Sequence, residues 1–223
     1  RTRLDGVDGS EAAARRRDRG AQGRPFRPDG VAAGGIKDWI SDGRERVVSD
    51  ISLETVTGKL NRLGYDAFIQ ALRLAKGAGN RNLELAHYFH AMLAQDRSDL
   101  ALTVDHYKLD RARLARDLAD TIEGFRKKET EMPGISHQIT DMLDGGWKYA
   151  TLAFGETQIR TGHLLVAALK SLELRRALTT LSREFASINV DQLMAEARTV
   201  WAQSNEENLR PMDGSGLAAR GAG

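Results

Sequence analysis

The chain has 223 residues, of which 41% are hydrophobic and 29% are charged, and these proportions are typical of a soluble globular protein. No apolar run approaches the roughly 20 residues that cross a bilayer, and the absence of cysteine excludes disulfides and thiolate-ligated metal sites. Residues 1–47 carry 11 Lys and Arg against 8 Asp and Glu, and the rest of the chain carries 22 Lys and Arg against 23 Asp and Glu. The charge of residues 48–223 is therefore not that of a basic nucleic-acid binder.

The N-terminal segment, residues 1–47, is rich in Arg, Gly and Asp and almost empty of large apolar side chains. Such a composition cannot bury enough surface to offset the entropy of ordering, so we expect a disordered extension. The run Arg15-Arg16-Arg17 indicates a solvated tail, with a nucleic-acid or membrane contact as the alternative. Because the first residue is Arg rather than Met, a fragment of a longer protein is expected.

The first helix is predicted from about Leu53 to Arg62, with Ser52 as its N-cap. Its apolar residues recur at helical spacing on one stripe: Leu53, Val56, Leu60 and Leu63. Two interpretations of this stripe remain open. It forms one wall of a groove that binds the apolar side of a partner helix, or it simply seals the helical bundle.

Two further groups of helices follow the first one. The first group is predicted at about 65–77, 85–94, 98–107 and 110–125, and Pro133-Gly134 closes it. The second group is predicted at about 135–154, 161–169, 174–181 and 191–201. Apolar residues nowhere alternate with polar ones over four or more positions, so no strand is predicted and the fold class is all-α.

The two groups are copies of one unit. The connector and helix at 82–93 match those at 158–169, which aligns His87 with His163, 76 positions on. A second match aligns Leu109-Asp110 with Ile188-Asn189, where Asp or Asn can cap a new helix. A single unit of a few helices cannot bury its apolar face alone, so the two copies are expected to pack on each other. Each histidine is predicted to hydrogen-bond the connector backbone.

The sequence contains few residue patterns that indicate catalysis, cofactor binding or metal binding. No phosphate-binding GxxxxGK[ST] loop occurs, and no Ser, His and Asp arrangement is suggested. His87 and His90 could supply two metal ligands, but no HExxH motif or carboxylate at ligand spacing accompanies them. We therefore predict no catalytic, cofactor-binding or metal site. Residues 203–223, rich in Asn, Glu and then Gly, are predicted to be a flexible linker.

Several stretches resemble a known family. The two helical repeats are similar to the N-terminal domain of the Clp/Hsp100 family of AAA+ unfoldases, and the details resemble one branch, ClpV (TssH) of type VI secretion. The matching stretches are Ser49-Asp50-Ile51-Ser52 before Gly58-Lys59-Leu60-Asn61, Tyr149-Ala150-Thr151-Leu152, Phe154-Gly155-Glu156, Gly162-His163-Leu164-Leu165 and Ser182-Arg183-Glu184-Phe185. The resemblance covers residues 48–202 approximately, whereas residues 1–47 lie outside it.

The resemblance implies a double four-helix domain carried on a hexameric ATPase ring. In that branch the domain recognises an N-terminal helix of a contracted sheath subunit, using an extra helix before the repeats. By position, the partner-binding residues would be Ile51, Leu53, Val56, Thr57 and Leu60. ATP and Mg²⁺ would belong to ATPase modules after the linker, not to this chain. A cytoplasmic location is implied, without nucleic-acid or membrane partners.

Two rival functions remain at this point. A general Clp-type N-domain would bind unfolded chains or adaptor proteins rather than one helix. A stand-alone helical enzyme or metal protein would use His87, His90 and scattered carboxylates.

Overall fold

The computed structural model describes residues 52–215, and the structure confirms the predicted all-α fold with two repeats of four helices. Ile51 and the predicted extension at residues 1–47 lie outside the described residues. A short helix comes first, α2 (Leu53–Gly58). The first repeat contains α3 (Arg62–Gly77), β1 (Asn82–Leu83), α4 (Leu85–Leu93), α5 (Asp99–His106) and α6 (Arg111–Gly124). The second contains β2 (Gly134–Ile135), α7 (His137–Leu152), α8 (Thr161–Lys170), α9 (Leu172–Leu181), η1 (Arg183–Ser187) and α10 (Val190–Val200).

Polar side chains cap most of these helices, because the first backbone N–H groups of a helix have no partner within it. The side chains of Ser52, Asp110 and Asn189 each accept a hydrogen bond from the backbone N–H three residues on, which confirms these three predicted caps. Ser98 caps α5 and Ser171 caps α9 in the same way.

The two repeats are tied together by backbone pairing across the domain. Strand β1 pairs in parallel with β2, so the connector of the first repeat lies against the start of the second. In the parallel bridge between Leu60 and Ile159 the roles are exchanged: the connector of the second repeat lies against the start of the first. These pairings are two residues long or shorter, which is below the length at which an alternating pattern can be recognised.

The bridge at Leu60 also shortens the first helix. The predicted helix from Leu53 to Arg62 ends at Gly58. Leu60 takes an extended bridge position, and Asn61 caps the next helix by accepting from the backbone N–H of Gly64 at 2.9 Å. Gly64 therefore lies in the first turn of α3 rather than separating two helices.

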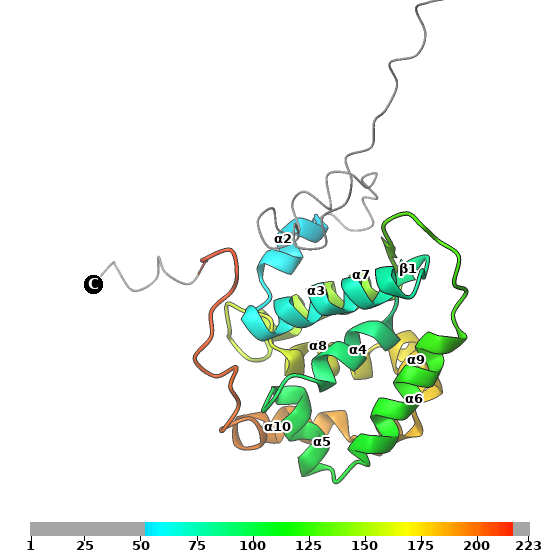
Figure 1. The fold of residues 1–223 in the computed structure, drawn as a ribbon. Helices are drawn as coiled ribbons and strands as arrows, with labels where there is room; N and C mark the ends of the chain where they lie inside the picture. The colour runs from blue at the N-terminus through cyan, green and yellow to red at the C-terminus, as the bar shows by residue number, and fades with distance from the viewer. Residues whose placement is uncertain (1–51, 216–223) are drawn as a thin grey trace, which may run out of the picture.

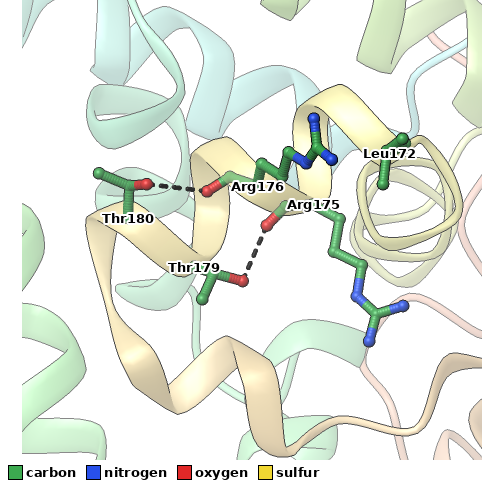
Figure 2. A pocket seen from close by; sticks show the side chains of 5 residues that line it. All are labelled: Leu172, Arg175, Arg176, Thr179 and Thr180. Atoms are coloured by element: carbon green, nitrogen blue, oxygen red, sulfur yellow. Dashed lines mark hydrogen bonds between the residues drawn. The ribbon is translucent and has the colours of Figure 1, made fainter.

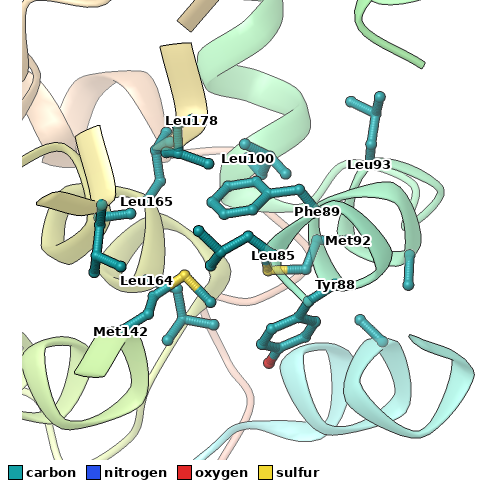
Figure 3. Packing of buried hydrophobic residues seen from close by; sticks show 14 of the residues in the cluster. Leu85, Tyr88, Phe89, Met92, Leu93, Leu100, Met142, Leu164, Leu165 and Leu178 are labelled. Carbon is teal, nitrogen blue, oxygen red and sulfur yellow. The ribbon is translucent and has the colours of Figure 1, made fainter. Parts of the chain in front are cut away.

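The core lies where the helices of the two repeats meet (Figure 3). Leu85 and Phe89 of α4 face Leu164 and Leu165 of α8, and Met142 of α7 lies below them in Figure 3. All of these side chains are buried. Burial of apolar area at about 25 cal/mol per Å² makes this layer the main source of stability.

The segment after α10 is ordered, which corrects the predicted flexible linker over residues 203–215. It runs along one side of the domain from α10 toward α2 (Figure 1). Met212 and Asp213 donate their backbone N–H groups to the carbonyls of Leu60 and Gly58, both at 2.9 Å, and Pro211 forms an antiparallel bridge with Asn61. The Asn- and Glu-rich composition suggested a solvated chain, but Glu206 is buried.

Candidate partner-binding site

The site predicted by resemblance lies on α2 and the residues that follow it. Leu53 is half-buried and packs against the core, whereas Val56, Thr57 and Leu60 are buried, with 2%, 0% and 0% of their surfaces exposed. The hydroxyl of Thr57 donates to the carbonyl of Leu53 at 2.8 Å, within the same helix.

The burial of Val56, Thr57 and Leu60 determines whether these side chains can contact a partner. A buried side chain offers no surface to a partner, so Val56, Thr57 and Leu60 do not form a groove wall in this structure. Their placement agrees with the alternative that the stripe seals the bundle. Leu60 is buried because the bridge to Ile159 places it between the two repeats. A partner contact by the α2 segment as a whole stays a prediction.

The surface beside α2 is completed by α7 and the C-terminal segment. Helix α2 packs on α7, where Trp147 is half-buried. The Lys59 ammonium lies 5.3 Å from the centre of the Trp147 ring and forms an ion pair with Asp213 at 2.7 Å. Met212 is 47% exposed on the same segment. The sequence pattern gave no signal for Met212 or Asp213.

A buried ion pair joins α5 to the start of α8. The Arg160 guanidinium donates to both carboxylate oxygens of Asp99, at 2.7 and 2.8 Å, and both side chains are buried. Arg160 also donates to Glu156 at 3.2 Å and to Glu207 at 2.9 Å. Burial and the neighbouring Glu206 carboxylate raise the pKa of Asp99 to about 7. Nothing in the spacing of these residues predicted the pair.

Glu206 connects the C-terminal segment to three helix starts. Its carboxylate accepts from the Asn61 side-chain amide at 2.7 Å, and from the backbone N–H groups of Asp99 and Thr161, both at 2.8 Å. The Thr161 hydroxyl donates to it as well. Because a carboxylate is favoured at a helix N-terminus, this one residue fixes the positions of α3, α5 and α8 relative to one another.

The two aligned histidines have the predicted structural role. The Nδ1 atom of His87 accepts from the Glu84 backbone N–H at 3.1 Å, and the Nδ1 atom of His163 accepts from Arg160 at 3.2 Å. The Nε2 atom of His87 is bonded to Asn80 at 2.9 Å. Both ring nitrogens of His87 are therefore engaged in hydrogen bonds. No group of three metal-ligating side chains occurs within residues 52–215.

Burial makes these histidines hard to protonate. It lowers the pKa of His87 to about 4 and that of His163 to about 3, the latter with help from the nearby Arg160 charge. In the unfolded chain a histidine takes up a proton near pH 6.5, whereas folded His163 does not until about pH 3. The unfolded state therefore binds more protons as the pH falls below 6.5, and stability is lost in that direction.

We expect His163 to account for a loss of about 2 kcal/mol in the free energy of unfolding between pH 7.5 and pH 5. Urea unfolding across this range should show that His163→Gln has a pH dependence weaker by that amount than wild type. Asp99 acts in the opposite direction over part of the range, so the difference between the two proteins is the relevant quantity. Thr103→Val, a variant that keeps His163, should retain the wild-type pH dependence; an unchanged dependence in His163→Gln would contradict the assignment.

A shallow hollow lies on the outer face of α9, lined by Leu172, Arg175, Arg176, Thr179 and Thr180 (Figure 2). The hydroxyls of Thr179 and Thr180 donate to the backbone carbonyls of Arg175 and Arg176, at 2.8 and 3.0 Å. The two arginine side chains extend in different directions (Figure 2), so they do not converge on one anion. We assign no function to this hollow.

None of the helices between residues 52 and 215 has both the length and the hydrophobicity that a membrane span requires. Residues 64–181 match the model of the Clp repeat (R) N-terminal domain family. This match covers more than half of the chain. The chain belongs to the Clp N-terminal domain family.

Relatives of the Clp N-terminal domain in curated proteins include ClpV as well as ClpB. The chain is 38% identical over 172 residues to the AAA+ ATPase ClpV1 of Pseudomonas aeruginosa, covering 77% of this chain and 19% of that protein. It is 30% identical over 165 residues to the chaperone ClpB of Yersinia enterocolitica, covering 74% and 18%. The chain thus spans about a fifth of the length of these relatives.

Solved structures agree with the Clp N-domain fold. One comes from work on the coevolution of the ATPase ClpV, the TssB-TssC sheath and the accessory HsiE protein in type VI secretion. It is 38% identical, has a TM-score of 0.69 and covers 72% of this chain and 99% of its own. Another is a complex of a ClpV N-domain with a VipB peptide, 23% identical with a TM-score of 0.60, covering 73% and 99%. The predicted resemblance to the ClpV N-terminal domain is confirmed.

Proposed function

We propose that this chain is the substrate-recognition domain of a type VI secretion unfoldase. It would bind an N-terminal helix of a contracted sheath subunit, so that an ATPase ring can disassemble and recycle the sheath. The 38% identity to ClpV1 and the peptide complex of a related ClpV N-domain support this proposal. The domain itself would be non-catalytic. ATP, Mg²⁺ and hexamer formation would belong to the full-length cytoplasmic protein.

The observation that carries the proposal is the position of α2. This helix lies outside the two repeats and packs on α7, where Leu53 and Trp147 are both only half-buried. An amphipathic helix binds such a surface with apolar anchors at i, i+3, i+4 and i+7. In this arrangement Leu53 and Trp147 would contact the partner, and the buried Val56 and Thr57 would hold α2 in place. Of the α2 side chains that the resemblance implied, Leu53 is thus the proposed partner contact.

The test is a fluorescence-anisotropy titration with peptides that carry the N-terminal helix of a sheath subunit. We expect Leu53→Asp and Trp147→Ala to weaken binding by about tenfold or more, because each removes an apolar contact. Leu172→Asp is the matched control, since Leu172 is 66% exposed on the distant α9 and its change should leave affinity within about twofold.

Two outcomes would overturn the proposal. Absence of binding by the wild-type chain would remove the sheath-helix function. Equal binding by the wild type and by both site variants would remove the site. Displacement of the bound peptide by an unfolded casein-like competitor at similar concentration would instead favour a general Clp-type N-domain that binds unfolded chains.

A further inference from the structure

The two repeats have the same loop after their first helix. Gly79 and Gly155 both follow that helix and both have a left-handed backbone, with φ of +65° and +67°. The next residues, Asn80 and Glu156, donate their backbone N–H groups to Ala75 and Ala150 at 2.9 and 2.8 Å. Asn80 and Glu156 are therefore counterparts, each facing the Nε2 atom of the aligned histidine of its own repeat, at 2.9 and 3.9 Å.

In the first repeat this loop is covered by the segment that follows α6. The carbonyl of Gly79 accepts two backbone hydrogen bonds, from Lys128 and Glu129, both at 3.1 Å. The Asn80 side chain donates to the carbonyl of Arg126 at 3.3 Å, and Asn80 is buried as a result. The covering segment reads Arg126-Lys127-Lys128-Glu129 and is basic.

In the second repeat the segment after α10 takes a different path. Its Glu206 is held by the starts of α5 and α8, and Asn205 donates to the carbonyl of Arg97. The counterpart loop is left with a hollow of about 340 Å³. The hollow is lined by Gly155, Glu156, Thr157, Gln158, Arg160 and Glu207.

Buried polar atoms around this hollow have no hydrogen-bond partner among the described residues. The side-chain carbonyl oxygen of Gln158 lines the hollow. The Nε2 atom of His163 is not part of the lining and lies 3.9 Å from a carboxylate oxygen of Glu156. Since Nδ1 of neutral His163 accepts a hydrogen bond, its Nε2 carries the proton and is a donor. A buried polar group without a partner is costly, so the Gln158 oxygen indicates that the hollow takes an occupant with a hydrogen-bond donor.

The charge of the hollow indicates the kind of occupant. Glu156 and Glu207 are acidic, and Arg160 is the basic residue among the six that line it. Arg160 pairs with the buried Asp99 and also with Glu156 and Glu207, so three carboxylates share one guanidinium. The excess of carboxylates favours a cationic group.

We propose that this hollow binds an extended segment of a partner polypeptide that carries Lys or Arg. The segment lies on the second repeat as residues 126–129 lie on the first. Two successive backbone N–H groups donate to the carbonyl of Gly155, and a basic side chain faces Glu207 and Glu156. This surface is separate from the α2 and α7 site, so it does not depend on the proposed function.

The probe is a fluorescein-labelled peptide that copies residues 125–131, titrated into the full chain by fluorescence anisotropy. We expect saturable binding with a dissociation constant below about 1 mM. A peptide N-methylated at the two amides that correspond to Lys128 and Glu129 keeps its charge but loses both donors. Its affinity should be lower by about tenfold, and equal affinity of the two peptides would overturn backbone docking.

Variants and a mapping experiment locate the binding. Glu207→Gln should weaken binding by about threefold to tenfold, whereas Glu173→Gln, an exposed carboxylate on α9, should leave it unchanged. Amide NMR shifts should centre on residues 155–158. No binding, or shifts centred on α2 and α7, would overturn the proposal. If deletion of residues 1–47 strengthens binding about tenfold or more, the occupant is this chain's own N-terminal segment and the partner assignment fails.

Discussion

Replacing Arg160 by methionine is expected to lower the free energy of unfolding by about 3 to 5 kcal/mol. Arg160 donates two hydrogen bonds to the Asp99 carboxylate, which is completely buried. Without the guanidinium the buried carboxylate must either remain charged beside the Glu206 carboxylate or take up a proton, and both are costly. Urea unfolding at pH 7.5 measures the loss.

The double variant Asp99→Asn with Arg160→Met tests the cause. Removal of the charge from both partners should restore part of the stability, because the penalty comes from the unpaired carboxylate. Arg113→Met removes a more exposed arginine that lies 3.8 Å from Glu184, and it should cost less than about 1 kcal/mol. If Arg160→Met costs no more than Arg113→Met, the buried pair does not stabilise this domain. Should Arg160→Met fail to fold, Arg160→Lys gives the intermediate measurement.

Replacing Glu206 by alanine is expected to cost about 3 kcal/mol, since about 1 kcal/mol is lost for each helix start that it caps. The amide of Asn61 and the backbone N–H groups of Asp99 and Thr161 all lose their acceptor. Relief of the repulsion between Glu206 and Asp99 offsets a part of this loss. Thermal or urea unfolding would show the effect.

The adjacent Glu207 is the matched control, because its side chain is 53% exposed and bonds only to Arg160 among the described residues. Glu207→Ala should cost less than about 1 kcal/mol. A chain that ends at residue 202 should be as unstable as Glu206→Ala or more so. Full stability of that shorter chain would show that the C-terminal segment is dispensable for folding.

The helices could be predicted from the sequence because local chemistry determines them. Ser52, Asp110 and Asn189 cap helices whose apolar periodicity is visible, and the 76-residue spacing of His87 and His163 indicated the repeat. The strand pairs were not predictable, since two residues carry no pattern. The Asp99 and Arg160 pair joins positions 61 residues apart, and the chemistry of neither residue indicates the other.

The candidate site was predicted less well, because periodicity identifies an apolar stripe but not what covers it. Val56 and Leu60 share their stripe with Leu53, yet Leu60 belongs to the pairing between the repeats and Leu53 stays at the edge. Trp147 beside α2 and the returning segment with Asp213 depend on contacts across the whole chain. The position of the α2 segment was implied by resemblance, whereas the burial of its individual side chains could be determined only from the structure.

The crosswise strand pairing has a consequence for the folding of the separate repeats. Each repeat lends its connector to the beginning of the other, through Leu83 with Ile135 and Ile159 with Leu60. Each repeat contains one connector and one starting segment that pairs with a connector. Two identical copies of one repeat would therefore hold every element needed for a symmetric homodimer. Separated halves of this domain are therefore expected to be unfolded as monomers and to fold only in pairs.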